Sequence, residues 1–269
     1  MVRTQCFPHG KAMTMTGSLP RRLFAELLGT ALLAFFGPGA VVAALALGKG
    51  SLDYAGLGII ALSFGLIVAL VIYALGTTSG AHINPAVTVA LAVTGRFRWA
   101  EVPAYVGSQV VGGVLGAFLV VGVAGTKAAT AAGVGLTSTS PGVGAGQAVL
   151  AEGLGTFLLL FTIMAVAVDR RAPVGWAGFL IGLAVVCEIF VIGPFTGGSV
   201  NPARTIGPYL ANTVSGGTTP WGELWIYVTG PVIGAVAAAF VYDRLVQPPE
   251  ADDDALVVTE ASDAPSGRS

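Results

Sequence analysis

Charged residues are scarce in this 269-residue chain: only 10% are Asp, Glu, Lys or Arg, whereas 54% are hydrophobic. Soluble globular proteins carry about 25% charged residues, so a chain this poor in charge cannot cover a water-facing surface. The formal net charge of −1 gives no electrostatic reason to bind nucleic acid. With a mean hydropathy of +0.82, the composition predicts an integral membrane protein.

Cysteine and histidine are also nearly absent, which excludes most metal and redox sites. Cys6 lies in a polar stretch and Cys187 in an apolar run, so we expect no disulfide between them and no metal-binding spacing. The two histidines, His9 and His82, have no serine partner in a facing apolar segment. The chain therefore offers no set of catalytic residues for an intramembrane enzyme, and we expect neither a cofactor nor a metal.

Long apolar runs are abundant instead. A helix needs about 20 apolar residues to cross a membrane, and six stretches are long enough: about 22–47, 54–76, 101–125, 147–168, 174–193 and 221–245. Two shorter runs, 84–95 and 201–212, begin with Asn-Pro. Asparagine is a favoured N-cap and proline a favoured first helical residue. The sequence thus predicts an all-α membrane protein with six transmembrane helices and two re-entrant half-helices.

The chain repeats itself in two pairs of matching segments: AELLGTALLAFF (25–36) with AEGLGTFLLLFT (151–162), and SGAHINPAVT (79–88) with GGSVNPARTI (197–206). Each half contains three predicted spans, so the second copy inserts upside down and the two form an inverted repeat. The half-helices then enter from opposite sides, and their N-termini at Asn84 and Asn201 can meet near the midplane.

Lysine and arginine predict the orientation. With six spans both termini lie on one side, which receives most of the basic residues: Arg3, Lys11, Arg21, Arg22, Arg96, Arg98, Arg170, Arg171, Arg244 and Arg268. The other side receives Lys49 and Lys127, while Arg204 belongs to neither. We therefore expect a multi-pass protein of the cell membrane with both termini cytoplasmic.

The two facing half-helices predict a specific chemistry. A helix N-terminus leaves backbone N–H groups unpaired and carries about half a positive charge, so two of them repel cations and hydronium but admit a neutral dipole. The Asn84 and Asn201 amides can donate hydrogen bonds to it. The preceding extended backbone supplies carbonyl acceptors from Gly80, Ala81, His82, Ile83, Gly198, Ser199 and Val200. Such backbone is tolerated at membrane depth only where it is buried or lines a cavity.

The chain resembles the aquaporin and glycerol-facilitator family, the major intrinsic proteins. The resemblance lies in these motifs, in the glutamate of the first span of each half, and in the count of six spans plus two half-spans. The resemblance covers about residues 21–246, as an aquaporin-like channel domain with halves of about 21–125 and 147–246. It implies a passive channel for water that excludes protons and ions, with glycerol and other small neutral solutes as further candidates. It also implies a homotetramer in a lipid bilayer. The family's pore motifs match Asn84, Pro85, Ala86, Asn201, Pro202 and Ala203.

The remaining segments are a predicted cytosolic tail at 1–20 and an acidic, Pro/Ser-rich tail at 247–269, which we expect to be disordered.

The resemblance further implies a constriction near the outer mouth, formed by Phe64, Ile189, Gly198 and Arg204. Strict water channels typically place histidine where this chain has Ile189, so the ring is expected to be wider and more apolar than a water-only ring. It lacks the second aromatic residue of glycerol facilitators, whereas Thr205 fits the water branch. This mixture resembles archaeal-type and some plant vacuolar aquaporins, and it leaves glycerol, ammonia, urea and dissolved gases open beside water.

Three glutamates, Glu26, Glu152 and Glu188, lie inside the predicted spans beyond the first three residues of each. Glu26 and Glu152 could serve ion coupling in a secondary transporter, the alternative to a channel, but no cluster of ion ligands accompanies them. Their symmetry favours structural carboxylates that accept hydrogen bonds from the backbone of the re-entrant loops. Adjacent helix positions point about 100° apart, so Glu188 is expected to point sideways from a pore-facing Ile189, toward the outer interface or a subunit contact. For His82, a hydrogen-bonded loop residue is favoured over a gating role.

Overall fold

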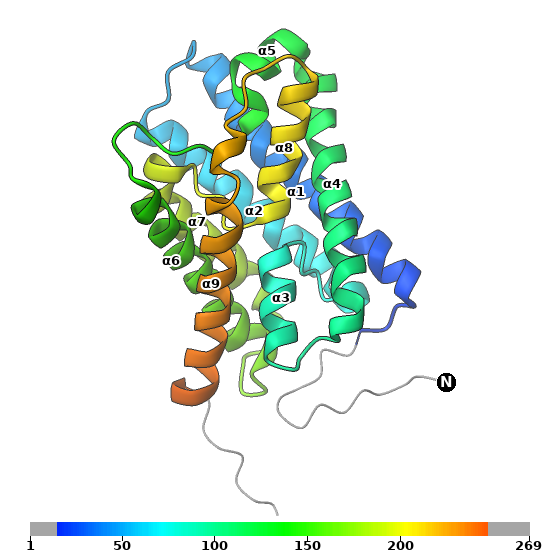
Figure 1. The fold of residues 1–269 in the computed structure, drawn as a ribbon. Coiled ribbons are helices and arrows are strands. Elements are labelled where there is room, and N and C mark those ends of the chain that lie inside the picture. The colour runs from blue at the N-terminus through cyan, green and yellow to red at the C-terminus, as the bar shows by residue number, and fades with distance from the viewer. Residues whose placement is uncertain (1–14, 247–269) are drawn as a thin grey trace, which may run out of the picture.

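The computed structural model describes residues 15–246, which form a helical bundle without β-strands in that range (Figure 1). The long helices are α1 (Leu19–Leu47), α2 (Tyr54–Ser79), α4 (Val102–Ala124), α6 (Ala145–Ile163), α7 (Ala177–Thr196) and α9 (Ile226–Val241). The short elements are α3 (Pro85–Val93), α5 (Thr126–Ala131) and α8 (Pro202–Val214), with the single turns η1 (Trp99–Glu101), η2 (Gly133–Gly135), η3 (Met164–Val168), η4 (Trp221–Glu223) and η5 (Tyr242–Val246). The predicted tail at 247–269, and residues 1–14 of the other tail, lie outside the described residues.

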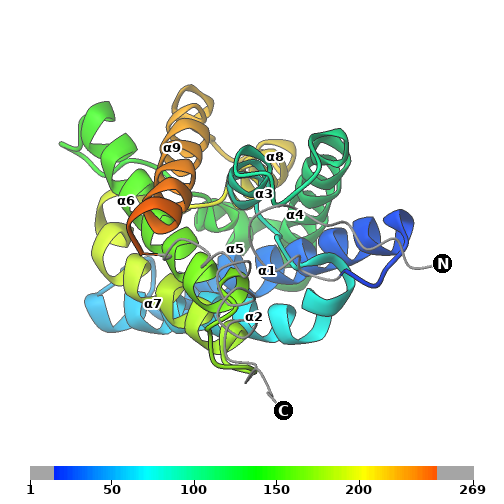
Figure 2. The ribbon, with the colours of Figure 1, turned by 90° about the horizontal axis from the view of Figure 1, so that it is seen from below.

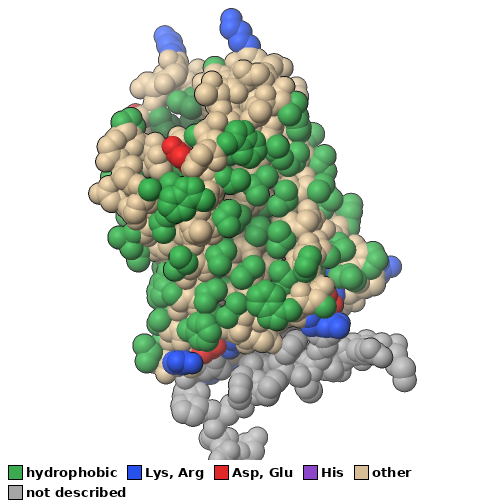
Figure 3. Space-filling view, in the orientation of Figure 1, with side chains coloured by type: hydrophobic (Ala, Val, Ile, Leu, Met, Phe, Trp, Pro, Cys, Tyr) green, Lys and Arg blue, Asp and Glu red, His purple; other side chains and the backbone are tan. Residues whose placement is uncertain are grey.

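Six helices are long and apolar enough to cross a membrane: Leu19–Leu47, Tyr54–Ser79, Trp99–Ala124, Ala145–Val168, Ala177–Thr196 and Trp221–Val246. They correspond to the six predicted spans, with ends that differ by a few residues. Figure 3 shows hydrophobic side chains over the middle of one face and basic side chains at both ends. The predicted fold class is therefore confirmed for the spans.

The two half-helices, α3 and α8, also begin where the sequence predicts. Asn84 and Asn201 are their N-caps: the side chain of Asn84 accepts a hydrogen bond from Ala86 N at 2.9 Å, and that of Asn201 accepts one from Ala203 N at 3.0 Å. Pro85 follows the first cap in the opening turn, as proline does after the second. In Figure 1, α3 occupies the lower half of the bundle and α8 the upper half. Seen from below, α3 lies between α4 and α9 (Figure 2).

The arginine-rich end of the bundle is tied together by ion pairs. Arg22 reaches Glu101 at 2.6 Å and joins α1 to η1, while Arg96 reaches Asp243 at 2.7 Å and joins the loop after α3 to η5. Between η3 and α7, the Arg171 side chain donates hydrogen bonds to Asp169 and lowers the pKa of that carboxyl group well below its usual range. The pairs Arg22–Glu101 and Arg96–Asp243 hold together segments that lie far apart in the sequence, whereas the Arg171–Asp169 pair is local to one loop.

Close helix contacts depend on glycine. A Cβ atom added to Gly113 of α4 would lie 2.5 Å from the carbonyl oxygen of Ala203, and one added to Gly207 of α8 would lie 2.3 Å from that of Gly113. Small residues allow helix backbones to approach this closely in membranes. Gly107, on the same helix α4, faces open space instead. Glycine at position 113 thus sets the distance between α4 and the start of α8.

We expect Gly113→Ala to destabilise the protein, because the added methyl group must push the backbone of α8 away. Overpacking of this kind costs about 1–3 kcal/mol, so the thermal unfolding midpoint in detergent should fall. Gly107→Ala is the matched control and should unfold at or above the wild-type midpoint, since alanine favours the helix by about 1 kcal/mol. Equal midpoints for the two variants would contradict this account of the contact.

Candidate pore

A buried carboxylate holds the first re-entrant loop. Glu26 of α1 accepts hydrogen bonds from the backbone N–H groups of His82 at 3.0 Å and Ile83 at 2.7 Å. The side chains of Ser79, at 2.7 Å, and Gln109, at 2.8 Å, fill its remaining acceptor positions. Gln109, on α4, was missed by the sequence analysis because a single glutamine in an apolar span carries no pattern.

Glu152 of α6 holds the second loop in the same way. It accepts hydrogen bonds from the backbone N–H groups of Ser199 at 3.0 Å and Val200 at 2.7 Å, and from the Thr196 hydroxyl at 2.7 Å. Within a membrane these N–H groups have no bulk water to pair with, and an unpaired one costs several kcal/mol, about as much as a lost hydrogen bond in an apolar medium. Both carboxylates therefore pair the backbone N–H groups of the re-entrant loops. This is the structural role that the symmetry of the two glutamates favours over ion coupling.

The loops hold strained backbone at corresponding positions. Ile83 has φ of 42° and Val200 has φ of 46°, a left-handed conformation that β-branched residues rarely adopt. Such strain persists only where the surroundings fix it. Each residue is held on both sides, because its N–H group donates to a glutamate and its carbonyl oxygen accepts from the opposite half of the chain.

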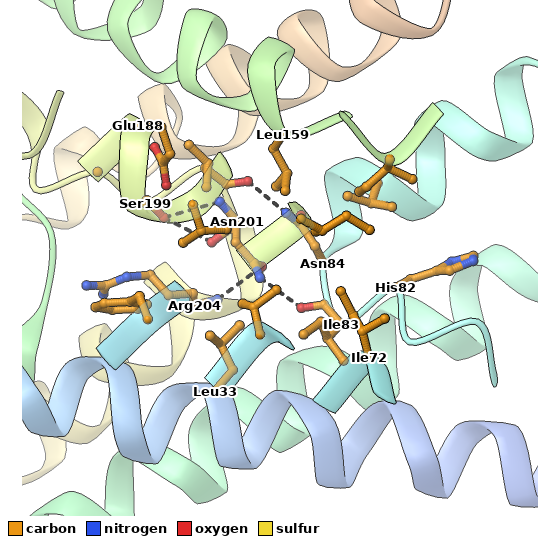
Figure 4. Close-up of a pocket in the computed structure, with 18 of the residues that line it drawn as sticks. Leu33, Ile72, His82, Ile83, Asn84, Leu159, Glu188, Ser199, Asn201 and Arg204 are labelled. Carbon is orange, nitrogen blue, oxygen red and sulfur yellow. Dashed lines mark hydrogen bonds between the residues drawn. The ribbon is translucent and has the colours of Figure 1, made fainter. Parts of the chain in front are cut away.

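The two asparagines supply those bonds across the repeat. Asn84 Nδ2 donates to Val200 O and Asn201 Nδ2 donates to Ile83 O, both at 2.8 Å (Figure 4). The amide oxygens are already used as helix caps, which fixes the orientation of each amide. An amide nitrogen carries two N–H groups, so each asparagine keeps one further donor for a molecule in the adjoining cavity.

A cavity runs past these asparagines. Figure 4 shows Asn84 and Asn201 between Arg204 on one side and His82 on the other. Its lining includes most residues predicted for the pore: Phe64, Ala81, His82, Ile83, Asn84, Ile189, Gly198, Ser199, Val200, Asn201 and Arg204. Gly80 lines a second cavity, which shares Ile72, Ala81, His82, Val87, Ile163 and Ile181 with the first. Pro85, Ala86, Pro202 and Ala203 line neither of these two cavities.

Aliphatic side chains complete the wall, among them Leu33, Val68, Leu159 and Val185. These side chains were not predicted from the sequence. Their helices are apolar on every side, so no hydrophobic period marks the face that turns inward.

Arg204 is held at one end of the cavity by a loop that the sequence did not indicate. Its Nη1 donates to the carbonyl oxygen of Gly135 at 2.9 Å, and its Cζ lies 4.9 Å from the ring centre of Phe64. Gly135 has φ of 69°, and an added Cβ would lie 2.4 Å from the Pro38 oxygen, so only glycine fits there. Arg204 Nε is buried and has no hydrogen-bond partner in residues 15–246.

His82 lies at the other end, where both cavities meet. Its Nδ1 is 3.2 Å from Thr88 Oγ1, and its ring packs edge-on against Phe97 at 4.9 Å between centres. These contacts are those of a hydrogen-bonded loop histidine.

The expected position of Glu188 is wrong. Glu188 is only 3% exposed and lines the cavity together with Ile189. Helix α7 packs against both α2 and α6, so two adjacent positions can face the interior. The side chain lies over Gly155 of α6, whose missing Cβ leaves room for the carboxyl group.

Comparison with known proteins gives concordant matches. Residues 13–242 match the family model "Major intrinsic protein". The probable aquaporin AqpM of Archaeoglobus fulgidus is 48% identical over 87% of this chain and 100% of its own length. Aquaporin AqpM of Methanothermobacter thermautotrophicus is 47% identical over 85% and 98%. The X-ray structure of the Plasmodium falciparum aquaglyceroporin matches with a TM-score of 0.76 and 26% identity, over 86% of this chain and 98% of that one.

We expect Glu152→Ala to lower the thermal unfolding midpoint strongly, because it leaves the Ser199 and Val200 N–H groups unpaired at about 1–3 kcal/mol each. Glu188→Ala is the matched control, because it removes a buried carboxyl group of the same size that has no hydrogen-bond partner within residues 15–246. Unfolding in detergent, followed by circular dichroism, measures both. If Glu188→Ala were as damaging as Glu152→Ala, the loop bonds would not be the cause.

Proposed function

Because this chain belongs to the major intrinsic protein family, we propose that it is a passive channel that conducts water and other small neutral solutes and excludes protons and ions. The observation that carries the proposal is the pair of reciprocal bonds that places Asn84 and Asn201 side by side in the cavity wall. The chain is a channel and not an enzyme. The ion-coupled transporter alternative has no support from the relatives.

Exclusion of ions follows from the charges along the cavity. The N-termini of α3 and α8 both point their positive dipole ends at the centre, and the Arg204 guanidinium adds a full positive charge. A cation therefore meets repulsion in a low-dielectric wall, which is how aquaporin-type pores exclude protons and cations. A water molecule can instead accept a hydrogen bond from the free N–H group of each asparagine.

The narrowest part is proposed to be the ring of Phe64, Ile189, Gly198 and Arg204, whose residues line one cavity. In this ring Phe64 and Ile189 set the width, and Arg204 supplies the hydrogen-bond donors. Gly198 adds no side chain and has φ of 58°. A ring with one aromatic and one aliphatic wall leaves space and apolar surface for the carbon skeleton of a small solute.

The orientation and assembly are part of the same proposal. Arg21, Arg22, Arg96 and Arg244 lie at the end of the bundle where α1 begins and η5 ends, opposite Lys49. The positive-inside rule assigns that end of the bundle to the cytoplasm. Both termini then lie on the cytoplasmic side of the cell membrane. Large apolar side chains are exposed on the outer helix faces. We assign them to contacts with lipid and with neighbouring subunits of a homotetramer.

Water conduction is tested directly in liposomes. Vesicles that contain the purified protein should shrink several times faster than empty vesicles after an osmotic shock, as followed by stopped-flow light scattering. The activation energy should be low, because the water no longer crosses lipid. Equal rates for a preparation shown to be folded would overturn the proposal.

The ring is tested with Phe64→Ala, which should raise glycerol permeability several-fold because it removes the aromatic wall beside Arg204. Phe36→Ala is the matched control, since Phe36 is 48% exposed and lies outside the cavity lining. Glycerol flux is measured by vesicle reswelling. If the two variants conduct glycerol equally, the constriction lies at another level of the passage.

A further inference from the structure

Glu188 differs from Glu26 and Glu152 in having no hydrogen-bond partner among the described residues. Both of its oxygens are buried and make no hydrogen bond to residues 15–246, whereas Glu26 and Glu152 are filled by loop donors. Glu188 nevertheless lines the cavity, one residue before Ile189 of the proposed ring. Figure 4 shows it beside the second re-entrant loop, near Ser199.

The inverted repeat supplies an internal reference for this position. Glu188 lies thirteen residues before Asn201, and Val71 lies thirteen residues before Asn84. The surroundings correspond as well. An added Cβ on Gly29 would meet side chains of Ile83, Val71 and Leu75, and one on Gly155 would meet those of Val200, Glu188 and Ile192. Val71 therefore occupies in the first half the place that Glu188 occupies in the second.

This correspondence separates packing from chemistry. Val71 is buried and fills its site with an apolar side chain, so the helix contact itself needs no carboxyl group. A buried polar group without a partner costs about 1–3 kcal/mol. The presence of a carboxyl group in the cavity wall, despite this loss of stability, is explained if a molecule that enters the cavity provides the missing hydrogen-bond partner.

Arg204 is a second polar residue of the cavity lining with an unused hydrogen-bonding atom among the described residues. Its Nε is also buried and unpartnered, and Arg204 and Glu188 do not pair with each other among the ion pairs of the described residues. The residues that line the cavity thus include one with an unused donor, Arg204, and one with unused acceptors, Glu188, among residues 15–246. The apolar side chains of Phe64 and Ile189 belong to the same lining. A molecule that carries several hydroxyl groups on a short carbon chain matches all three features.

We propose that Glu188 is a specificity-determining residue that accepts a hydrogen bond from a hydroxyl group of a permeating polyol, while Arg204 donates to another of its oxygens. In either protonation state a carboxyl group retains lone pairs that accept hydrogen bonds. The inference rests on the proposed channel function and deepens it by naming the solute class. Water passes without Glu188, since the asparagines and loop carbonyls provide its hydrogen bonds.

The test compares Glu188→Met, which keeps the volume and removes the acceptors, with Glu188→Gln, which keeps one acceptor oxygen. Glycerol and water permeability are measured in the same proteoliposomes. We expect Glu188→Met to lower the ratio of glycerol to water permeability by about five- to tenfold, the loss of one strong hydrogen bond. Glu188→Gln should keep the ratio within about twofold of wild type on the same basis.

The thermal unfolding midpoint distinguishes this role from a structural one. Because the carboxyl group has no partner within residues 15–246, Glu188→Met should leave the midpoint unchanged or raise it. An unchanged permeability ratio in Glu188→Met, or a fall in both permeabilities together with a lower midpoint, would overturn the inference.

The wild-type protein separates the two proposals. If it conducts no water, the channel function itself fails. If it conducts water but no glycerol, only the polyol inference fails. Faster glycerol flux in Glu188→Met than in wild type would also overturn the inference, because Glu188 would then be a barrier.

Discussion

The structure depends on the reciprocal hydrogen bonds between Asn84 and Val200 and between Asn201 and Ile83, both 2.8 Å long. They join the tips of two half-helices that enter from opposite ends of the bundle, so one complete crossing is built from two incomplete ones. The carbonyl groups involved belong to non-helical backbone at membrane depth, which is stable only when its polar groups are paired or line a cavity. The crossed bonds pair two of these groups and bring the others to the cavity wall.

Glu26 and Glu152 stabilise that arrangement by binding the N–H groups of the two re-entrant loops. Glu26 accepts hydrogen bonds from the N–H groups of His82 and Ile83, and Glu152 accepts them from those of Ser199 and Val200. Ile83 and Val200 are also the residues whose carbonyl oxygens accept from the asparagine of the opposite half. The positive φ angles of Ile83 and Val200 are thereby fixed on both sides of the residue. A glutamate that is fully used in this way has little capacity left for ion coupling, which agrees with a passive pore and not with a transporter.

The repeat is symmetric in its scaffold and asymmetric in its chemistry. Arg204 and Glu188 belong to the second half, and the equivalent of Glu188 in the first half is Val71. The groups proposed to select the solute are thus concentrated beside one re-entrant loop, where the carbonyl oxygen of Gly135 accepts a hydrogen bond from Arg204. The other end of the cavity contains His82, packed against Phe97. The two ends of the cavity thus differ through the side chains at a few positions of a common framework.

Sequence alone determined the six spans through their hydrophobic length and the two half-helices through their Asn-Pro caps. It also determined that Asn84 meets Asn201, because three spans in each half make the repeat inverted. All of these are local or countable properties of the chain. The sequence also placed Glu26 and Glu152 at equivalent points of the two halves. Tertiary structure decided the rest. Gln109 and Gly135 act through contacts with residues far away in the chain, and uniformly apolar helices carry no mark of their inner face. Glu188 turns inward because α7 is packed against both α2 and α6, a neighbourhood that helix geometry within one segment cannot reveal.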